Sequence, residues 1–152
     1  MLTNPDFLQF LLLAKKSTYA SGAGSSGSSR PASSDLKFEQ GDFLYFDTYL
    51  GSRDFIGEEA VWFRGQPIWG MNYHGIMLVD KIPDGFFEIL HAALSAVPAE
   101  APFRGPVELT MGDFRYTCQW QGSLDRYQGS ERIDHLGRPV YDLFFHGGRI
   151  TS

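Results

Sequence analysis

A short pattern that occurs twice limits the fold of this chain more than any other feature. Residues 41–45 read GDFLY, and residues 112–116 read GDFRY. The likeness continues downstream with one inserted residue, and the segments 7–11 and 86–90 resemble each other as well. Self-similarity of this extent predicts a structural unit that the chain uses twice.

Each unit is predicted to be one helix followed by an antiparallel β-meander. Alternating apolar and polar residues and Gly-containing turns predict strands at about 42–50, 55–64, 67–74, 113–121, 125–135 and 139–146. Short extended pieces precede each set, at 36–39 and 107–110. The sequence therefore predicts an α+β fold with an internal duplication and approximate two-fold symmetry. In this interpretation residues 1–152 form a single domain with repeats over about 4–75 and 84–147.

A Gly/Ser-rich stretch, residues 21–29, separates the first helix from the first strands. It contains a G-x-G-x-x-G pattern between Gly22 and Gly27. A dinucleotide-binding loop of this kind follows a strand and opens a helix. Here the stretch follows a predicted helix, for which Asn4 is the N-cap and Pro5 the first residue, and it precedes an extended segment. We therefore predict a flexible connector, with a mobile flap over a pocket as the alternative.

Composition argues against several classes of function. A formal net charge of −5 does not suit a surface that neutralises phosphates, so we expect no direct contact with nucleic acid. The single cysteine, Cys118, excludes an intramolecular disulfide and a cysteine-based zinc site, and it is predicted to be a buried core thiol. The apolar run 7–14 is too short to span a bilayer, and its lysines follow it rather than precede it. We expect a cytoplasmic protein without membrane contact, metal or cofactor.

The alternation also predicts which side chains face the interior. The predicted inner face consists of Phe43, Tyr45, Asp47, Tyr49, Glu59, Val61, Phe63, Trp69, Met71, Tyr73, Phe114, Tyr116, Cys118, Trp120, Glu131, Ile133, Tyr141, Leu143 and Phe145. A buried carboxylate without partners costs several kcal/mol or takes up a proton, so Asp47 and Glu59 need a reason to be there. Glu59 aligns with Glu131, which favours a structural hydrogen bond. Asp47 aligns with Cys118 and is the stronger functional candidate.

The leading hypothesis is a small-molecule-binding domain with an aromatic pocket. The predicted lining consists of Tyr45, Tyr49, Trp69, Tyr73, Tyr116 and Trp120, with Asp47 and Glu59 as acidic anchors and Arg30 and Arg104 at the rim. Such a pocket would suit a polar or cationic planar ligand. Two alternatives remain: a hydrolase-type enzyme in which Asp47 and Glu59 form an acid/base pair, and a protein-interaction module without a pocket.

Six segments of the chain carry a family resemblance: AKKSTYA (14–20), SSRPASSDL (28–36), GDFLYFDTYLG (41–51), GEEAVW (57–62), PIWGMNYHG (67–75) and PFRGP (102–106). They resemble a bacterial domain family of unknown function that is often found after an XRE-type helix-turn-helix in transcriptional regulators, and also alone. The resemblance implies a sensor or effector-binding role. This chain has no helix-turn-helix of its own, so direct DNA binding is not expected.

An apolar stripe is predicted on the outer face of the first unit. It consists of Leu44, Phe46, Leu50 and Trp62. Burying such side chains is worth roughly 1.5–3 kcal/mol each, so the stripe should be covered. A homodimer is one explanation, and the N-terminal helix lying across the stripe is the other.

Overall fold

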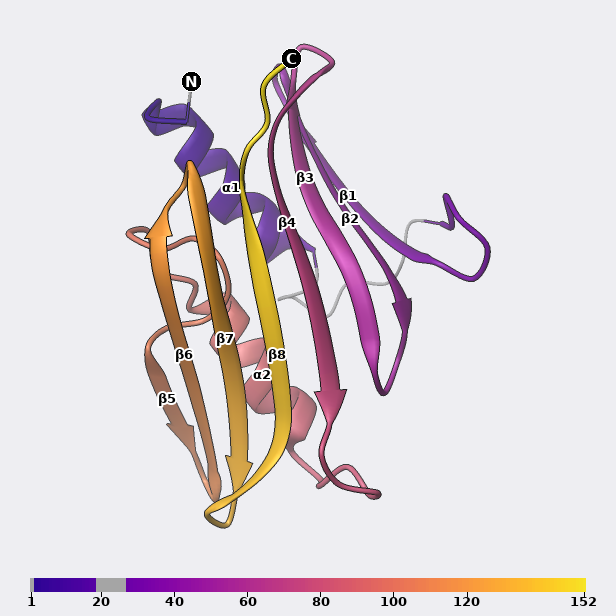
Figure 1. The fold of residues 1–152 in the computed structure, drawn as a ribbon, viewed down its shortest axis with the longest axis vertical. Helices are drawn as coiled ribbons and strands as arrows, with labels where there is room; N and C mark the ends of the chain where they lie inside the picture. Colours follow the sequence, from indigo (N-terminus) through magenta and orange to yellow (C-terminus); the bar gives the residue numbers. More distant parts are fainter. Residues whose placement is uncertain (1, 19–26) are drawn as a thin grey trace.

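One antiparallel sheet of eight strands forms most of the protein, and two short helices lie against one of its faces (Figure 1). The structure is a computed structural model and describes residues 2–18 and 27–152. In chain order the elements are α1 (Pro5–Ser17), β1 (Ser34–Gln40), β2 (Phe43–Gly51), β3 (Phe55–Phe63), β4 (Gln66–Met77), α2 (Phe86–Ser95), β5 (Glu108–Met111), β6 (Phe114–Ser123), β7 (Arg126–His135) and β8 (Arg138–Arg149). The strand order across the sheet is β1-β2-β3-β4-β8-β7-β6-β5.

The predicted fold class, an α+β duplication of a helix and a meander, is wrong. Strands hold 52% of the described residues and helices 16%. β4 pairs with β8 from Trp69 opposite Arg149 to Met77 opposite Tyr141, so all eight strands belong to one continuous sheet. Pairing these two long strands satisfies backbone groups that would otherwise form exposed sheet edges. Sequence similarity reports the order of local elements, and it does not report this long-range pairing.

The positions of the individual elements agree with the sequence analysis to within a few residues. Asn4 caps α1, and its Oδ1 accepts a hydrogen bond of 2.9 Å from the backbone N–H of Asp6. Pro5 is the first residue of the helix, and lysines occupy its last turn, where positive charge interacts favourably with the helix dipole. Neither described helix is long and apolar enough to cross a membrane.

The predicted inner face of the sheet is confirmed. Most of its side chains are buried, whereas Phe43, Tyr49, Phe63 and Trp120 are half-buried. The helices cover this face through aromatic contacts, which add to the free energy gained from apolar burial. The ring of Phe10 on α1 stacks on that of Phe43, with ring centres 5.0 Å apart. The ring of Phe86 on α2 packs edge-to-face against that of Tyr141, with ring centres 5.3 Å apart.

The outer face of the sheet is not covered by either helix. α1 packs on the inner face, where the ring of Phe7 contacts Trp69 at 6.4 Å, so the suggestion that this helix covers the outer stripe is wrong. The four stripe residues are half-buried. Two apolar side chains elsewhere on this face are more open: Ile56 is 55% and Phe144 is 69% exposed. The homodimer stays a prediction.

Most of the predicted flexible stretch 21–29 lies outside the described residues. Its last three residues are described. Gly27 forms a bridge with Asp35, and the backbone N–H of Ser29 donates a hydrogen bond of 2.5 Å to Asp35 Oδ2. This end of the stretch is therefore fastened to β1.

Candidate functional site

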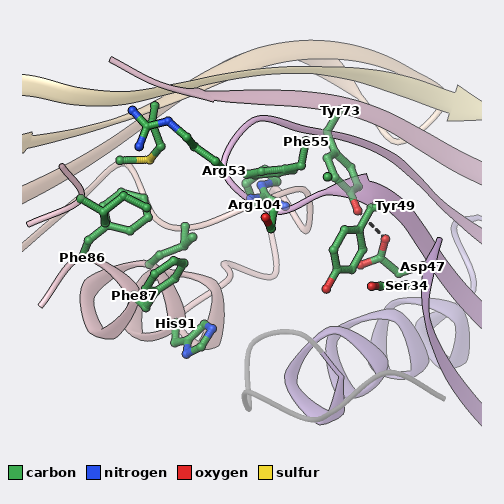
Figure 2. Close-up of a pocket in the computed structure, with 15 residues that line it drawn as sticks. Ser34, Asp47, Tyr49, Arg53, Phe55, Tyr73, Phe86, Phe87, His91 and Arg104 are labelled. Atoms are coloured by element: carbon green, nitrogen blue, oxygen red, sulfur yellow. Dashed lines mark hydrogen bonds between the residues drawn. The ribbon is translucent and has the colours of Figure 1, made fainter. Parts of the chain in front are cut away.

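A hollow of about 340 Å³ lies between the inner face of the sheet and α2 (Figure 2). This volume is at the lower end of the range for small-molecule sites. Its apolar wall consists of Phe55, Met77, Ile82, Phe86, Phe87 and Leu90, and its polar and amphipathic wall of Ser34, Asp47, Tyr49, Ser52, Arg53, Tyr73, His91 and Arg104. The sheet provides one side, α2 the other, and the loop before β5 brings in Arg104.

Asp47 on β2 lies in this wall, although only 3% of its surface is exposed. The hydroxyl of Tyr73 donates a hydrogen bond of 2.6 Å to Asp47 Oδ1 (Figure 2). Burial and then the nearby charge of Glu59 raise the pKa of Asp47 from 3.8 to about 7, and the Tyr73 hydrogen bond, Lys15 and Arg104 oppose that rise. Asp47 therefore changes its charge near neutral pH.

Glu59 lies directly opposite Asp47 on the neighbouring strand β3. Its carboxylate forms a buried ion pair with Lys15 of α1. The Lys15 ammonium also donates a hydrogen bond of 2.8 Å to the carbonyl of Phe103, and it lies 5.7 Å from the ring centre of Trp69. The pKa of Lys15 lies below its usual value, because the effect of burial is larger than the opposing effect of Glu59. This ion pair ties α1 to the sheet.

Glu131 on β7 holds Arg104 in a second buried ion pair. Arg104 Nη2 donates to Glu131 Oε1 at 2.6 Å, and Arg104 Nε donates to Oε2 at 3.2 Å. The hydroxyls of Tyr116 and Tyr141 donate to the same carboxylate at 2.5 and 2.9 Å. A bidentate guanidinium–carboxylate pair of this kind is strong and fixes the orientation of both side chains. The Arg104 guanidinium also lies 5.5 Å from the ring centre of Tyr73, which brings this ion pair to the wall of the hollow.

These residues form one buried polar cluster of three carboxylates and two cations. Lys15 pairs with Glu59, and Arg104 pairs with Glu131. Among residues 2–18 and 27–152, no ion pair joins a cation to Asp47. A smaller cavity of about 20 Å³, large enough for one water molecule, adjoins the cluster, and both Asp47 and Arg104 contribute to its lining. Asp47 is thus the carboxylate of the cluster that faces the hollow without a cation partner.

A family model described as "Domain of unknown function (DUF5680)" matches residues 47–150. The chain belongs to this family. The match begins at Asp47 and includes α2, Arg104 and Glu131, whereas Lys15 and the whole of α1 precede it. No curated protein and no solved structure matches the chain. The expected membership in a domain family of unknown function is therefore confirmed, and the DUF5680 assignment carries no activity with it.

The DUF5680 structure brings together some of the predicted site residues and separates others. Four line the hollow: Asp47, Tyr49, Tyr73 and Arg104. Three are fully buried in the core and do not line it: Tyr45, Trp69 and Tyr116. Arg104 is buried rather than at an exposed rim, and Glu59 lines only the small cavity.

The remaining two predicted residues lie away from the hollow. Trp120 is half-buried beside Phe103, with ring centres 6.5 Å apart. Arg30 donates a hydrogen bond of 2.9 Å to the hydroxyl of Thr48. Because Thr48 follows Asp47 in a strand, its side chain points to the opposite face of the sheet, so Arg30 lies on that outer face.

Sequence reasoning missed the contributions of the two helices. Phe87 and His91 of α2 are four residues apart, so they share a helix face, and both line the hollow. Lys15 follows Leu11 by four residues and Phe7 by eight, which places its side chain on the buried side of α1. That spacing was a usable signal for Lys15. Nothing in the sequence of α2 indicated which strands it would face.

The prediction that Cys118 is a buried core thiol is confirmed. Its side chain is buried on β6. Burial, together with the charge of Glu131, raises the pKa of the thiol to about 12. A thiol with this pKa is almost entirely protonated at neutral pH and therefore a poor nucleophile.

Proposed function

We propose that this DUF5680 chain binds a small organic molecule in the hollow, with Asp47 as its polar anchor. The observation that carries the proposal is a buried carboxylate in the wall of a hollow that is partly apolar, and among the described residues no ion pair joins this carboxylate to a cation. Burying such a group away from water costs free energy, and recognition of a ligand is a function that would explain its position.

The remaining wall suits a flat apolar body. Rings of Tyr49, Phe55, Tyr73 and Phe86 surround the space in Figure 2. Phe87 also lines it while 46% exposed, which leaves a large apolar ring in contact with water. A ligand that covered this ring would gain from its burial. We expect one polar group at Asp47 and an aromatic or aliphatic body between the sheet and α2.

The biological role that fits this proposal is effector sensing. The sequence resembles domains that accompany XRE-type regulators, and such a domain would respond to a metabolite. Binding of DNA by this chain is not part of the proposal, because its net charge of −5 does not suit a phosphate-binding surface.

A second candidate is an enzyme that uses Asp47 in acid/base chemistry. It is favoured by the pKa of about 7, which lies near the optimum for proton transfer at neutral pH. Glu59 lies directly opposite Asp47, but its pairing with Lys15 and its absence from the wall of the hollow leave Asp47 to act alone. A panel of chromogenic ester and glycoside substrates tests this candidate: turnover that disappears in Asp47→Asn supports it, and no turnover refutes it for these substrates.

A thermal-shift screen of metabolites tests the binding proposal. It compares the wild type with Asp47→Asn, which keeps an acceptor for Tyr73, and with Glu58→Gln. Glu58 is the exposed neighbour of Glu59 on the outer face of β3 and serves as the matched control. Compounds that stabilise the wild type and Glu58→Gln but not Asp47→Asn support the proposal. If every stabilising compound acts equally on all three proteins, this hollow is not the binding site.

A further inference from the structure

The charges around Asp47 limit the chemical class of the ligand more narrowly than the shape of the hollow does. This inference rests on the proposed function. We infer that the ligand group held at Asp47 is a cation, an ammonium or an amidinium, rather than a neutral or anionic group. The arrangement that points to it is a buried carboxylate beside aromatic rings at one end of the hollow, with both neighbouring cations already paired to other carboxylates.

The cluster lacks one positive charge. It contains Asp47, Glu59 and Glu131 against Lys15 and Arg104. Lys15 is held by Glu59 on the side of α1, and Arg104 is held by two hydrogen bonds to Glu131. When Asp47 is ionised, the cluster has a net charge of −1. A ligand cation in the hollow would supply the missing charge at the one carboxylate it can reach.

The arginines of the hollow do not make it a site for anions. Arg104 Nε and Nη2 both donate hydrogen bonds to the Glu131 carboxylate. Arg53 donates from both terminal nitrogens to backbone carbonyls, to Asp80 at 2.8 Å and to Val79. In Figure 2 the Arg53 side chain extends away from Asp47. An anionic group near Asp47 would meet a like charge, and the nearest guanidinium, that of Arg104, is already neutralised by Glu131.

Aromatic rings beside Asp47 add a second attraction for a cation. Tyr49 and Tyr73 lie next to the Asp47 carboxylate in Figure 2, and both line the hollow. The face of an aromatic ring carries negative potential and attracts ammonium and guanidinium groups, most strongly where water is excluded. The Arg104 guanidinium already lies 5.5 Å from the ring centre of Tyr73, which shows that a cation can lie against this aromatic wall.

Binding of a cation should also displace a proton from Asp47. The titratable and charged groups around Asp47 are Tyr45 of β2, Glu59 of β3, Tyr73 of β4, Lys15 of α1 and Arg104 of the loop after α2, and β1 places the apolar Leu36 opposite Asp47. Arg53 and His91 line the same hollow. Burial and Glu59 raise the pKa of Asp47 to about 7, so the carboxyl is largely protonated at pH 6. A cation favours the ionised form, so its affinity should increase from pH 6 to pH 8.

Matched probes that share one aromatic body and differ in one group test the inference. The first set is tryptamine, tryptophol and indole-3-propionate, and the second is the amine, alcohol and acid of the phenylethyl series. Titration calorimetry at pH 8 should show at least one amine binding about tenfold more tightly than its alcohol, the size expected of a single charge–ring or charge–charge contact. Asp47→Asn should abolish this preference, and Glu58→Gln should keep it. At pH 6 the amine should bind more weakly and release protons to the buffer.

The outcomes separate this inference from the proposed function. Equal or tighter binding of an alcohol or acid that Phe87→Ala weakens would overturn the cation and leave the hollow as a binding site. Failure of all the amines to bind overturns the cation as well, while the metabolite screen decides the hollow independently. An amine preference that persists in Asp47→Asn would also refute the inference, because the attraction would then come from elsewhere.

Discussion

Replacing Asp47 with asparagine should stabilise the protein at pH 8 and change its stability little at pH 4. The pKa of Asp47 is about 7 in the folded state, whereas the carboxyl of an unfolded chain keeps its ordinary value of 3.8. Between these two values the folded state holds a proton that the unfolded state has released. The free energy of unfolding of the wild type therefore falls as pH rises from about 4 to 7, and the asparagine variant lacks this contribution.

The size of the effect follows from the shift. One pKa unit corresponds to 1.36 kcal/mol, so a rise of about three units corresponds to roughly 4 kcal/mol of stability lost by pH 8. Asparagine keeps an acceptor for the Tyr73 hydroxyl, and the pKa of about 7 already includes the opposing attractions of Lys15 and Arg104, so a gain of roughly 4 kcal/mol at pH 8 is expected. Domains of this kind unfold with about 5–15 kcal/mol, so the gain should be obvious.

Urea unfolding followed by tryptophan fluorescence at several pH values between 4 and 8 measures this effect. The quantity to compare is the difference in unfolding free energy between Asp47→Asn and the wild type, because titration of all other groups then cancels. Glu58→Gln provides the control for removing a nearby exposed carboxylate. A difference that stays constant from pH 4 to 8, or one that favours the wild type more as pH rises, would refute the raised pKa and with it the isolated carboxylate.

Three further predictions follow from the same structure. Lys15→Met should leave Glu59 buried without its cation and lower the free energy of unfolding in urea by roughly 3–5 kcal/mol. The control Lys16→Met, on the exposed side of α1, should change this free energy by less than about 0.5 kcal/mol. Equal effects of the two substitutions would contradict the buried ion pair. Cys118 should react only slowly with an aromatic disulfide reagent at pH 8 until urea unfolds the protein, and rapid labelling of the native state would contradict its burial. If the outer stripe forms a homodimer interface, sedimentation at low micromolar concentration should show a dimer that Trp62→Glu dissociates, and a monomer in both proteins would rule the dimer out.

Period-two alternation gave the correct faces of the strands because the direction of a side chain in a strand is a local property. The alternation alone predicts that Asp47, Glu59 and Glu131 point inward, and the cap at Asn4 locates the first helix in the same way. The state of a single position was also predictable from sequence: the apolar face of its strand predicted that Cys118 is a buried thiol. In each case a few neighbouring residues carry the whole physical cause.

Tertiary packing decided the rest. The pairing of β4 with β8 made one sheet where two units were expected, because strand pairing satisfies backbone groups that are far apart in sequence. The inward faces of Tyr45, Trp69 and Tyr116 could not indicate that these rings would be sealed into the core, since that depends on where α1 and α2 come to rest. The partners of the carboxylates depend on the same packing. Lys15 arrives on a helix and Arg104 on a loop, and only their three-dimensional positions leave Asp47 facing the hollow without a cation.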